Sequence, residues 1–132
     1  MSLNTINIIA DNIGNEYSQY ETNDNATYLA HSRFTPQEKE SGMLTVTYNA
    51  VNVNTAAAVN RMKIVRYKMV NGVATIVQAQ NVYTNADTGM TNVDAVPTID
   101  GGTDLVFSIT GLSGQTIRHS LKVERLSSQL QQ

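Results

Sequence analysis

Residues 105–126 of the chain read LVFSITGLSGQTIRHSLKVERL, and their pattern decides the fold class. Apolar side chains occupy every second position in 105–109 and again in 117–123, where His119 takes one of the apolar positions. A period of two is typical of strands with one buried face. Glycines at both ends of the segment 111–114 favour a short loop between these strands. The stretch therefore predicts two antiparallel strands joined as a hairpin.

The residues upstream follow the same pattern. Asn71-Gly72 separates two alternating segments, 61–70 and 73–84, and this dipeptide tolerates the positive φ angles of a type I′ turn. The arrangement predicts a second β-hairpin. Residues 43–54 predict a long strand whose apolar phase shifts at Val51, which indicates a bulge or a crossing between sheets.

The remaining segments add one more strand and no helix. Pro97 has no backbone N–H, so it confines a strand over 90–96 to a sheet edge or to a strand end. The segment 55–60 is too short for a stable helix and predicts a loop or a single turn. With about six or seven strands, we expect an all-β chain folded as an antiparallel β-sandwich or jelly roll.

The first forty residues differ in character from the rest. The segment 11–25 is rich in Asp, Asn, Gly and Ser, which favour turns and irregular backbone. We therefore divide the chain into an irregular N-terminal arm, residues 1–40, and a β-sandwich domain, residues 41–132. The arm is expected to provide attachment or oligomer contacts through Ile6, Ile8, Tyr17, Tyr20, Tyr28 and Phe34. The alternative is that these aromatics cover the core of the domain itself.

The composition is polar but weakly charged. Hydrophobic residues make up 41% of the 132 residues and charged residues 15%, below the roughly 25% typical of soluble domains. The net charge of −2 argues against electrostatic binding of nucleic acid. The sequence lacks an N-terminal signal-peptide pattern and a run of about 20 apolar residues that would span a membrane. We expect a soluble chain, with neither nucleic acid nor membrane as partner, that packs against copies of itself or a larger particle.

Few residues have the spacing that catalysis or metal binding requires. Ser113 lies in Gly-Leu-Ser-Gly and not in the Gly-x-Ser-x-Gly pattern of a nucleophile elbow, so we assign it to a loop. Two histidines without any cysteine do not supply a zinc site. Oxygen donors in the turns 85–87 and 100–104, including Asp100 and Asp104, could hold calcium, but Asp-Gly is first of all a turn former. We assign no catalytic residue, no cofactor and no metal.

A group of basic residues lies within one predicted strand: Arg61, Lys63, Arg66 and Lys68. Their spacing divides them between both faces of the strand. They could form a patch for an anionic partner, but we favour the interpretation that they protect a sheet edge and face solvent.

The closing stretch carries a family resemblance. Residues 105–124 resemble the terminal strand pair of small β-domains in structural proteins of tailed bacteriophages. Those domains commonly end in an apolar strand, a Thr-Gly-x-x-Gly-x-Thr loop and a strand of the form Ile-Arg-Trp-x-Ala-x-Val-Glu. The similarity extends more weakly to residues 44–53, 62–67 and 73–82, and it leaves out the N-terminal arm.

Two residues depart from the family pattern. His119 stands where the family usually has Trp, and Leu121 stands where Ala is common, so the packing beneath this strand must differ. We interpret His119 as half-buried and satisfied by hydrogen bonds. A pH-sensitive role is the alternative, because an unperturbed histidine titrates near 6.5.

The resemblance implies a non-enzymatic protein located in the virion. It would act by self-assembly, with a trimer preferred, and by docking on other virion proteins such as major capsid or tail proteins, as capsid decoration or as a small tail or fibre component. The alternative function is a receptor- or carbohydrate-binding module for host attachment, in which Tyr67, Tyr83 and the Asn-rich turns would contact the sugar.

Overall fold

The computed structural model describes the backbone of residues 4–10 and 15–128 and the side chains of residues 16–128. This part of the chain forms nine strands and no helix, which confirms the all-β prediction. The strands are β1 (Asn4–Ala10), β2 (Asn15–Thr22), β3 (Thr27–Phe34), β4 (Ser41–Asn52), β5 (Ala58–Val70), β6 (Val73–Ala86), β7 (Asp94–Asp100), β8 (Asp104–Thr110) and β9 (Ile117–Ser127). Within the same residues, no helix has the length and hydropathy to cross a membrane.

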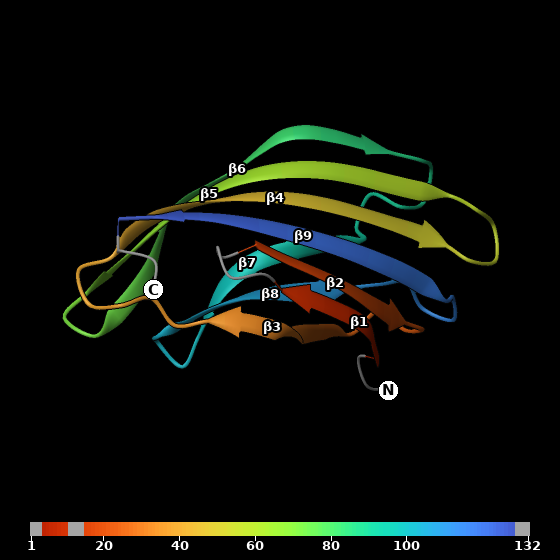
Figure 1. Ribbon diagram of the computed structural model, residues 1–132. Coiled ribbons are helices and arrows are strands. Elements are labelled where there is room, and N and C mark those ends of the chain that lie inside the picture. Colours follow the sequence, from red (N-terminus) through yellow and green to blue (C-terminus); the bar gives the residue numbers. More distant parts are fainter. Residues whose placement is uncertain (1–3, 11–14, 129–132) are drawn as a thin grey trace.

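The strands form two antiparallel sheets that pack face to face, as predicted for a β-sandwich (Figure 1). The large sheet has the order β1-β2-β9-β4-β5-β6, and the small sheet has the order β3-β8-β7. The core between them is mainly apolar and includes Leu44, Val46 and Tyr48 of β4 and Leu105 and Ile109 of β8, all of which are buried. Because the large sheet is wider than the small one, one end of it extends past the second layer.

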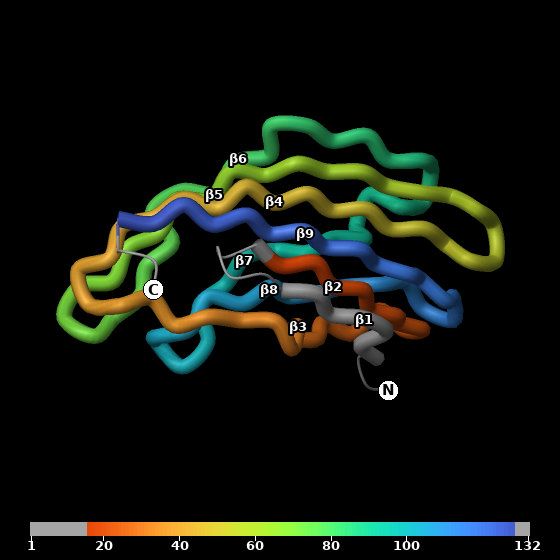
Figure 2. Tube along the Cα trace, viewed as in Figure 1, coloured from red at the N-terminus to blue at the C-terminus, as the bar shows by residue number. Residues whose placement is uncertain are grey.

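The final two strands do not form the expected hairpin. Strand β8 pairs with β3 and β7 in the small sheet, whereas β9 pairs with β2 and β4 in the large sheet. The connecting segment 111–116 therefore crosses from one layer to the other (Figure 2). A Cβ on Gly111 would lie 2.1 Å from Thr22 Oγ1, and Gly114 has a φ of 69°, so both glycines are required by this crossing. Alternating patterns identify strands but do not assign them to a sheet.

The hairpin at Asn71-Gly72 is confirmed. The two residues have φ angles of 54° and 76°, as a type I′ turn requires, and β5 pairs with β6 from Val70 back to Val59 with two shifts of register. The Glu38 carboxylate accepts hydrogen bonds from both turn amides. Strand β4 is confirmed as well, but without a bulge, because its pairing with β5 and β9 is continuous. The apparent phase shift arises because the inner position after Ala50 is a buried Asn52.

The prediction of an irregular arm is wrong for residues 15–34. Strand β2 pairs with β9 over eight residue pairs, and β3 pairs with β8. Their inner positions include the polar residues Ser18, Thr22 and Ser32, so no apolar period is visible in the sequence. Tyr20 Oη donates a hydrogen bond of 2.9 Å to Ser32 Oγ across the two sheets, and Thr22 Oγ1 is hydrogen-bonded as well. Hydrogen bonds between buried groups therefore allow Thr22 and Ser32 to take the place of aliphatic residues.

Strand β7 begins later than expected and continues beyond Pro97. Met90 and Val93, which the sequence placed in the strand, are buried in the segment that links β6 to β7. Pro97 is tolerated because β7 lies at the edge of the small sheet, where its missing N–H breaks no ladder. The edge placement predicted from Pro97 is thus confirmed.

Candidate functional site: the outer face and free end of the large sheet

The outer face of the large sheet carries two parallel rows of side chains, which follow from the strand register. One row runs across the sheet from one tyrosine to another and contains Tyr17, Lys122, Thr47, Met62 and Tyr83. We call it the tyrosine row. The next row contains amides and a hydroxyl, Gln19, Ser120, Asn49, Asn60 and Asn85, and we call it the amide row. Both rows cross five strands, β2, β9, β4, β5 and β6.

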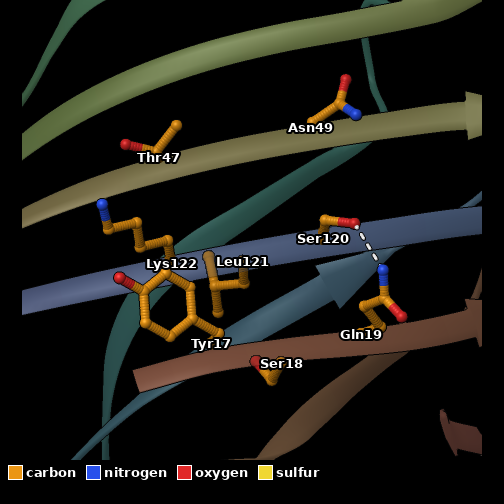
Figure 3. A pocket seen from close by; sticks show the side chains of 8 residues that line it. All are labelled: Tyr17, Ser18, Gln19, Thr47, Asn49, Ser120, Leu121 and Lys122. Carbon is orange, nitrogen blue, oxygen red and sulfur yellow. Dashed lines mark hydrogen bonds between the residues drawn. The ribbon is translucent and has the colours of Figure 1, made fainter. Parts of the chain in front are cut away.

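A hollow of about 290 Å³ lies between the two rows at the β2 end (Figure 3). Its lining residues are Tyr17, Ser18, Gln19, Thr47, Asn49, Ser120, Leu121 and Lys122. Ser18 and Leu121 are buried on the inner face, so they line the floor through their backbone. Gln19 Nε2 donates to Ser120 Oγ at 3.5 Å, and Lys122 Nζ lies 5.3 Å from the centroid of the Tyr17 ring. The hollow presents one aromatic ring beside amide and hydroxyl groups.

The charges around the hollow are paired. Lys122 Nζ lies 3.5 Å from Glu124 Oε1, and this carboxylate is the main cause that raises the pKa of Lys122. Arg118 Nε lies 3.3 Å from Glu21 Oε2. Exposed pairs of this kind contribute little to stability. They leave the hollow close to neutral.

The opposite end of the large sheet projects beyond the small sheet (Figures 1 and 2). Residues 77–85 of β6 are exposed without interruption, on both faces of the strand, and we call them the overhang. Val77, Val82 and Tyr83 have 39%, 49% and 54% of their surface exposed. The pairing of β6 with β5 shifts register at two places, which indicates bulges. Thus β6, the last strand of the sheet, buries almost no side-chain surface along the overhang.

The predicted contact residues are divided between core and surface. Tyr20 is fully buried, and Tyr28 and Phe34 are partly buried against the core, as the alternative interpretation expected. Tyr17 is exposed and lines the hollow. The backbone of Ile6 and Ile8 belongs to β1, and their side chains lie outside the described residues.

His119 is fully buried, not half-buried, and its ring is held on both sides. Its Nδ1 lies 2.6 Å from Tyr48 Oη and its Nε2 lies 2.9 Å from Thr22 Oγ1. A neutral imidazole has one donor and one acceptor, which these two hydroxyls satisfy. Burial lowers the pKa of His119 to about 4, so the ring is neutral at neutral pH. The expected hydrogen bonding is confirmed, and the histidine links β2, β9 and β4.

Tyr67, a residue expected to contact sugar, is instead buried in the core. Its Oη donates to Glu40 Oε2 at 2.5 Å and accepts from Arg125 Nε at 3.1 Å. Burial, and then the bond to Glu40, raises the pKa of Tyr67 to about 12. Burial alone would raise the pKa of Glu40, but its bonds with Tyr67, the Gln37 amide and Arg125 hold it below its ordinary value. Tyr83, the other candidate, is exposed on the tyrosine row.

The basic residues of β5 are divided between the faces as predicted, but two of them are not solvated. Arg61 and Lys63 are buried, and both contact Asp94, at 3.3 and 3.1 Å. Arg66 and Lys68 are exposed on the outer face. Strand β5 is not an edge strand, so edge protection does not explain any of them.

The carboxylates considered for calcium have a partner in the chain itself. The Arg33 guanidinium pairs with Asp100 and lies 3.5 Å from Asp104. Asp104 also accepts a hydrogen bond of 2.5 Å from Thr35, and this bond is the largest of the causes that lower the pKa of Asp104. Asp87 accepts from the Ala58 amide. Across the described part of the chain, no group of three or more His, Cys, Asp or Glu side chains could hold a metal ion.

The residues of the hollow other than Tyr17 were missed by the sequence analysis. Gln19 and Ser120 are 101 positions apart in the chain, and they meet only because β2 pairs with β9. Outward positions of strands are polar in most sheets, so the amides carry no signal until the strand order is known.

Comparisons with known proteins give distant structural likenesses only. No protein-family model and no curated protein matches the sequence. Among solved structures, the chain is similar to the tailspike protein of Acinetobacter phage vB_ApiP_P1, with 12% identity and a TM-score of 0.47 over 92% of this chain and 24% of that one. It is also similar to tailspike protein gp49 of Acinetobacter baumannii bacteriophage Fri1, a capsular polysaccharide depolymerase, with 14% identity and a TM-score of 0.40 over 92% of this chain and 19% of that one. The chain thus spans less than a quarter of the length of either phage tailspike.

Proposed function

We propose that this chain is a non-enzymatic structural component of a tailed-bacteriophage virion, in a tail, a fibre or a capsid decoration. It acts by self-assembly and by docking on other virion proteins. The resemblance of residues 105–124 to phage structural domains supports the virion context. The groups best suited to chemistry have structural roles, since His119 and Glu40 are buried and hydrogen-bonded to neighbouring strands.

The overhang is the observation that carries the assembly role. Strand β6 contains no charged residue and no proline, which are devices that keep sheet edges from associating. Its exposed apolar side chains include Val77, Val82 and Tyr83. Contact with another chain would bury them, and it would also cover backbone groups at the free edge. The two bulges interrupt the row of backbone groups at this edge. We therefore expect side chains on both faces of β6 to contribute to the contact, in addition to backbone pairing.

Sedimentation velocity of the purified chain over a range of concentrations tests the proposal. The wild-type chain is expected to form a defined oligomer, with a trimer preferred, and the double variant Val77→Lys with Val82→Lys is expected to stay at the monomer mass. Met43→Lys is the matched control, because Met43 is 42% exposed on the same sheet but lies away from the overhang. Identical association of the wild type and the double variant would exclude the overhang as the contact surface.

A further inference from the structure

We infer that the outer face of the large sheet binds an extended, neutral polysaccharide chain along the tyrosine and amide rows. Tyr83 and Asn85, at one end of the two rows, also belong to the overhang, so this binding site adjoins the surface proposed for assembly. The two rows cross five neighbouring strands, and strands lie about 4.8 Å apart, so the rows are about 19 Å long. A linear polymer that lies across the strands would contact both rows at once.

The tyrosine row supplies surfaces for the apolar faces of sugar rings. Tyr17 is 40% exposed at one end of the row and Tyr83 is 54% exposed at the other. An aromatic ring buries a large apolar area at a small cost in side-chain entropy, and the C–H groups of a sugar present a surface of that kind. In Figure 3 the Tyr17 ring lies beside the Lys122 side chain, whose ammonium group is 5.3 Å from the ring centroid and favours one ring position.

The amide row supplies groups that match sugar hydroxyls. A hydroxyl donates and accepts hydrogen bonds, and so does a primary amide. Asn60 Nδ2 donates to Asn49 Oδ1 at 2.5 Å, and this bond orients both side chains. It does not use the NH₂ group of Asn49, which can donate to a sugar hydroxyl. Gln19 and Ser120 are linked in the same way at 3.5 Å. The row is thus a partly ordered set of donors and acceptors on an open face.

Charge favours a neutral polymer over an acidic one. Lys122 is the only charged residue in the two rows, and Glu124 lies 3.5 Å from it. The Arg118–Glu21 pair beside the amide row is balanced as well. An anionic chain would find no cluster of uncompensated cations in these two rows, whereas a neutral polyhydroxylated chain needs none. The hollow of about 290 Å³ is at the small end of the roughly 300–1,000 Å³ typical of small-molecule sites, which fits one sugar unit seated within a longer open groove.

Affinity electrophoresis of the full chain through gels that contain dextran, mannan, galactan or, as an acidic comparison, alginate tests this inference. We expect retardation by at least one of the three neutral polymers, stronger than that by alginate. The double variant Tyr17→Ala with Asn49→Ala should lose about tenfold or more in association constant, because stacking and hydrogen bonding are removed together. Met43→Ala is the control, since it removes an exposed apolar side chain from the same face outside the two rows.

Thermal melting must show that the double variant is folded, which we expect because Tyr17 and Asn49 are exposed. Retardation by no neutral polymer would overturn the inference. So would retardation that is equal in the wild type and the double variant, or preference for alginate. Sedimentation of the same samples is independent of this readout, so a failed binding test leaves the assembly proposal standing.

Discussion

Strands β9 and β6 belong to the same sheet, but they have opposite surroundings. The inner face of β9 is covered by the small sheet, and Ile117, His119 and Leu121 are buried. Residues 77–85 of β6 are exposed on both faces. The two strands differ because the small sheet has three strands and the large sheet has six, so the small sheet covers β9 but leaves residues 77–85 of β6 uncovered. We call the region where the two sheets pack against each other the covered part. We conclude that folding stability is concentrated in the covered part and that the overhang is available for contacts.

Removal of residues 1–40 is the most severe test of this division. The truncation deletes β2 and β3, and with them the partner of β9 on one side, one edge of the small sheet and the buried Tyr20. We expect complete loss of cooperative folding, although the sequence alone assigned the whole β-sandwich to residues 41–132. Circular dichroism during thermal unfolding is the measurement. A cooperative melt of the truncated chain would show that the covered part is smaller than we describe.

Glu40→Ala should be the single substitution that damages the covered part most. It leaves the buried Tyr67 hydroxyl and the Arg125 guanidinium without their carboxylate, and loss of one partner of a buried pair costs about 3–5 kcal/mol in free energy of unfolding. Glu38→Ala is the matched control two residues away, where the carboxylate is exposed and accepts from the Asn71 and Gly72 amides. Urea unfolding of both variants gives the comparison. Equal losses in the two would contradict the account of the covered part.

His119 predicts a pH dependence of stability that belongs to the covered part alone. The unfolded chain binds a proton to this histidine near pH 6.5, whereas the folded chain does so only near pH 4. The stability due to neutral His119 is therefore complete above pH 6.5 and is lost as the pH falls from 6.5 to 4, by up to about 3 kcal/mol. Urea unfolding at pH 7 and pH 4 measures the loss, with His119→Gln as the control that should lack this component. If His119→Gln loses as much stability between pH 7 and pH 4 as the wild type does, the loss does not come from His119.

The smallest effect is expected for Val82→Ala in the overhang, and Leu44→Ala in the core gives the contrast. Leu44→Ala removes a fully buried side chain and should cost about 2–5 kcal/mol. Val82→Ala removes a side chain that is 49% exposed in the overhang and should change the free energy of unfolding by less than about 0.5 kcal/mol. Both are read from urea unfolding at a concentration where the chain is monomeric. A large loss for Val82→Ala would mean that β6 has a core contact of its own.

The strands could be predicted where their inner positions are apolar. In β4, Leu44, Val46 and Tyr48 alternate with residues that are exposed or only partly buried, and the hairpin after β5 follows from Asn71-Gly72. Strand β2 could not be predicted, because polar Ser18 and Thr22 flank Tyr20 on its inner face. Burial of Thr22 is possible because a residue far along the chain, His119, supplies its hydrogen-bond partner.

The candidate site could be predicted only in part. Tyr17 was identified as a contact residue, but the sequence gives no reason to place it beside Lys122 or near Asn49, since that depends on the order β2-β9-β4. The overhang was not predicted either. The alternation in β6 resembles that of a strand with a buried face, and nothing in β6 itself reveals that the second sheet ends before it.

Hydrogen exchange of the full chain at low and high protein concentration tests the central claim most directly, because it reports contacts segment by segment. If the overhang is the contact surface, exchange of the amides in residues 77–85 slows as concentration rises, while exchange in β9 stays the same. If exchange in residues 77–85 is independent of concentration while another segment becomes protected, the contact surface lies elsewhere and the account of the overhang is wrong.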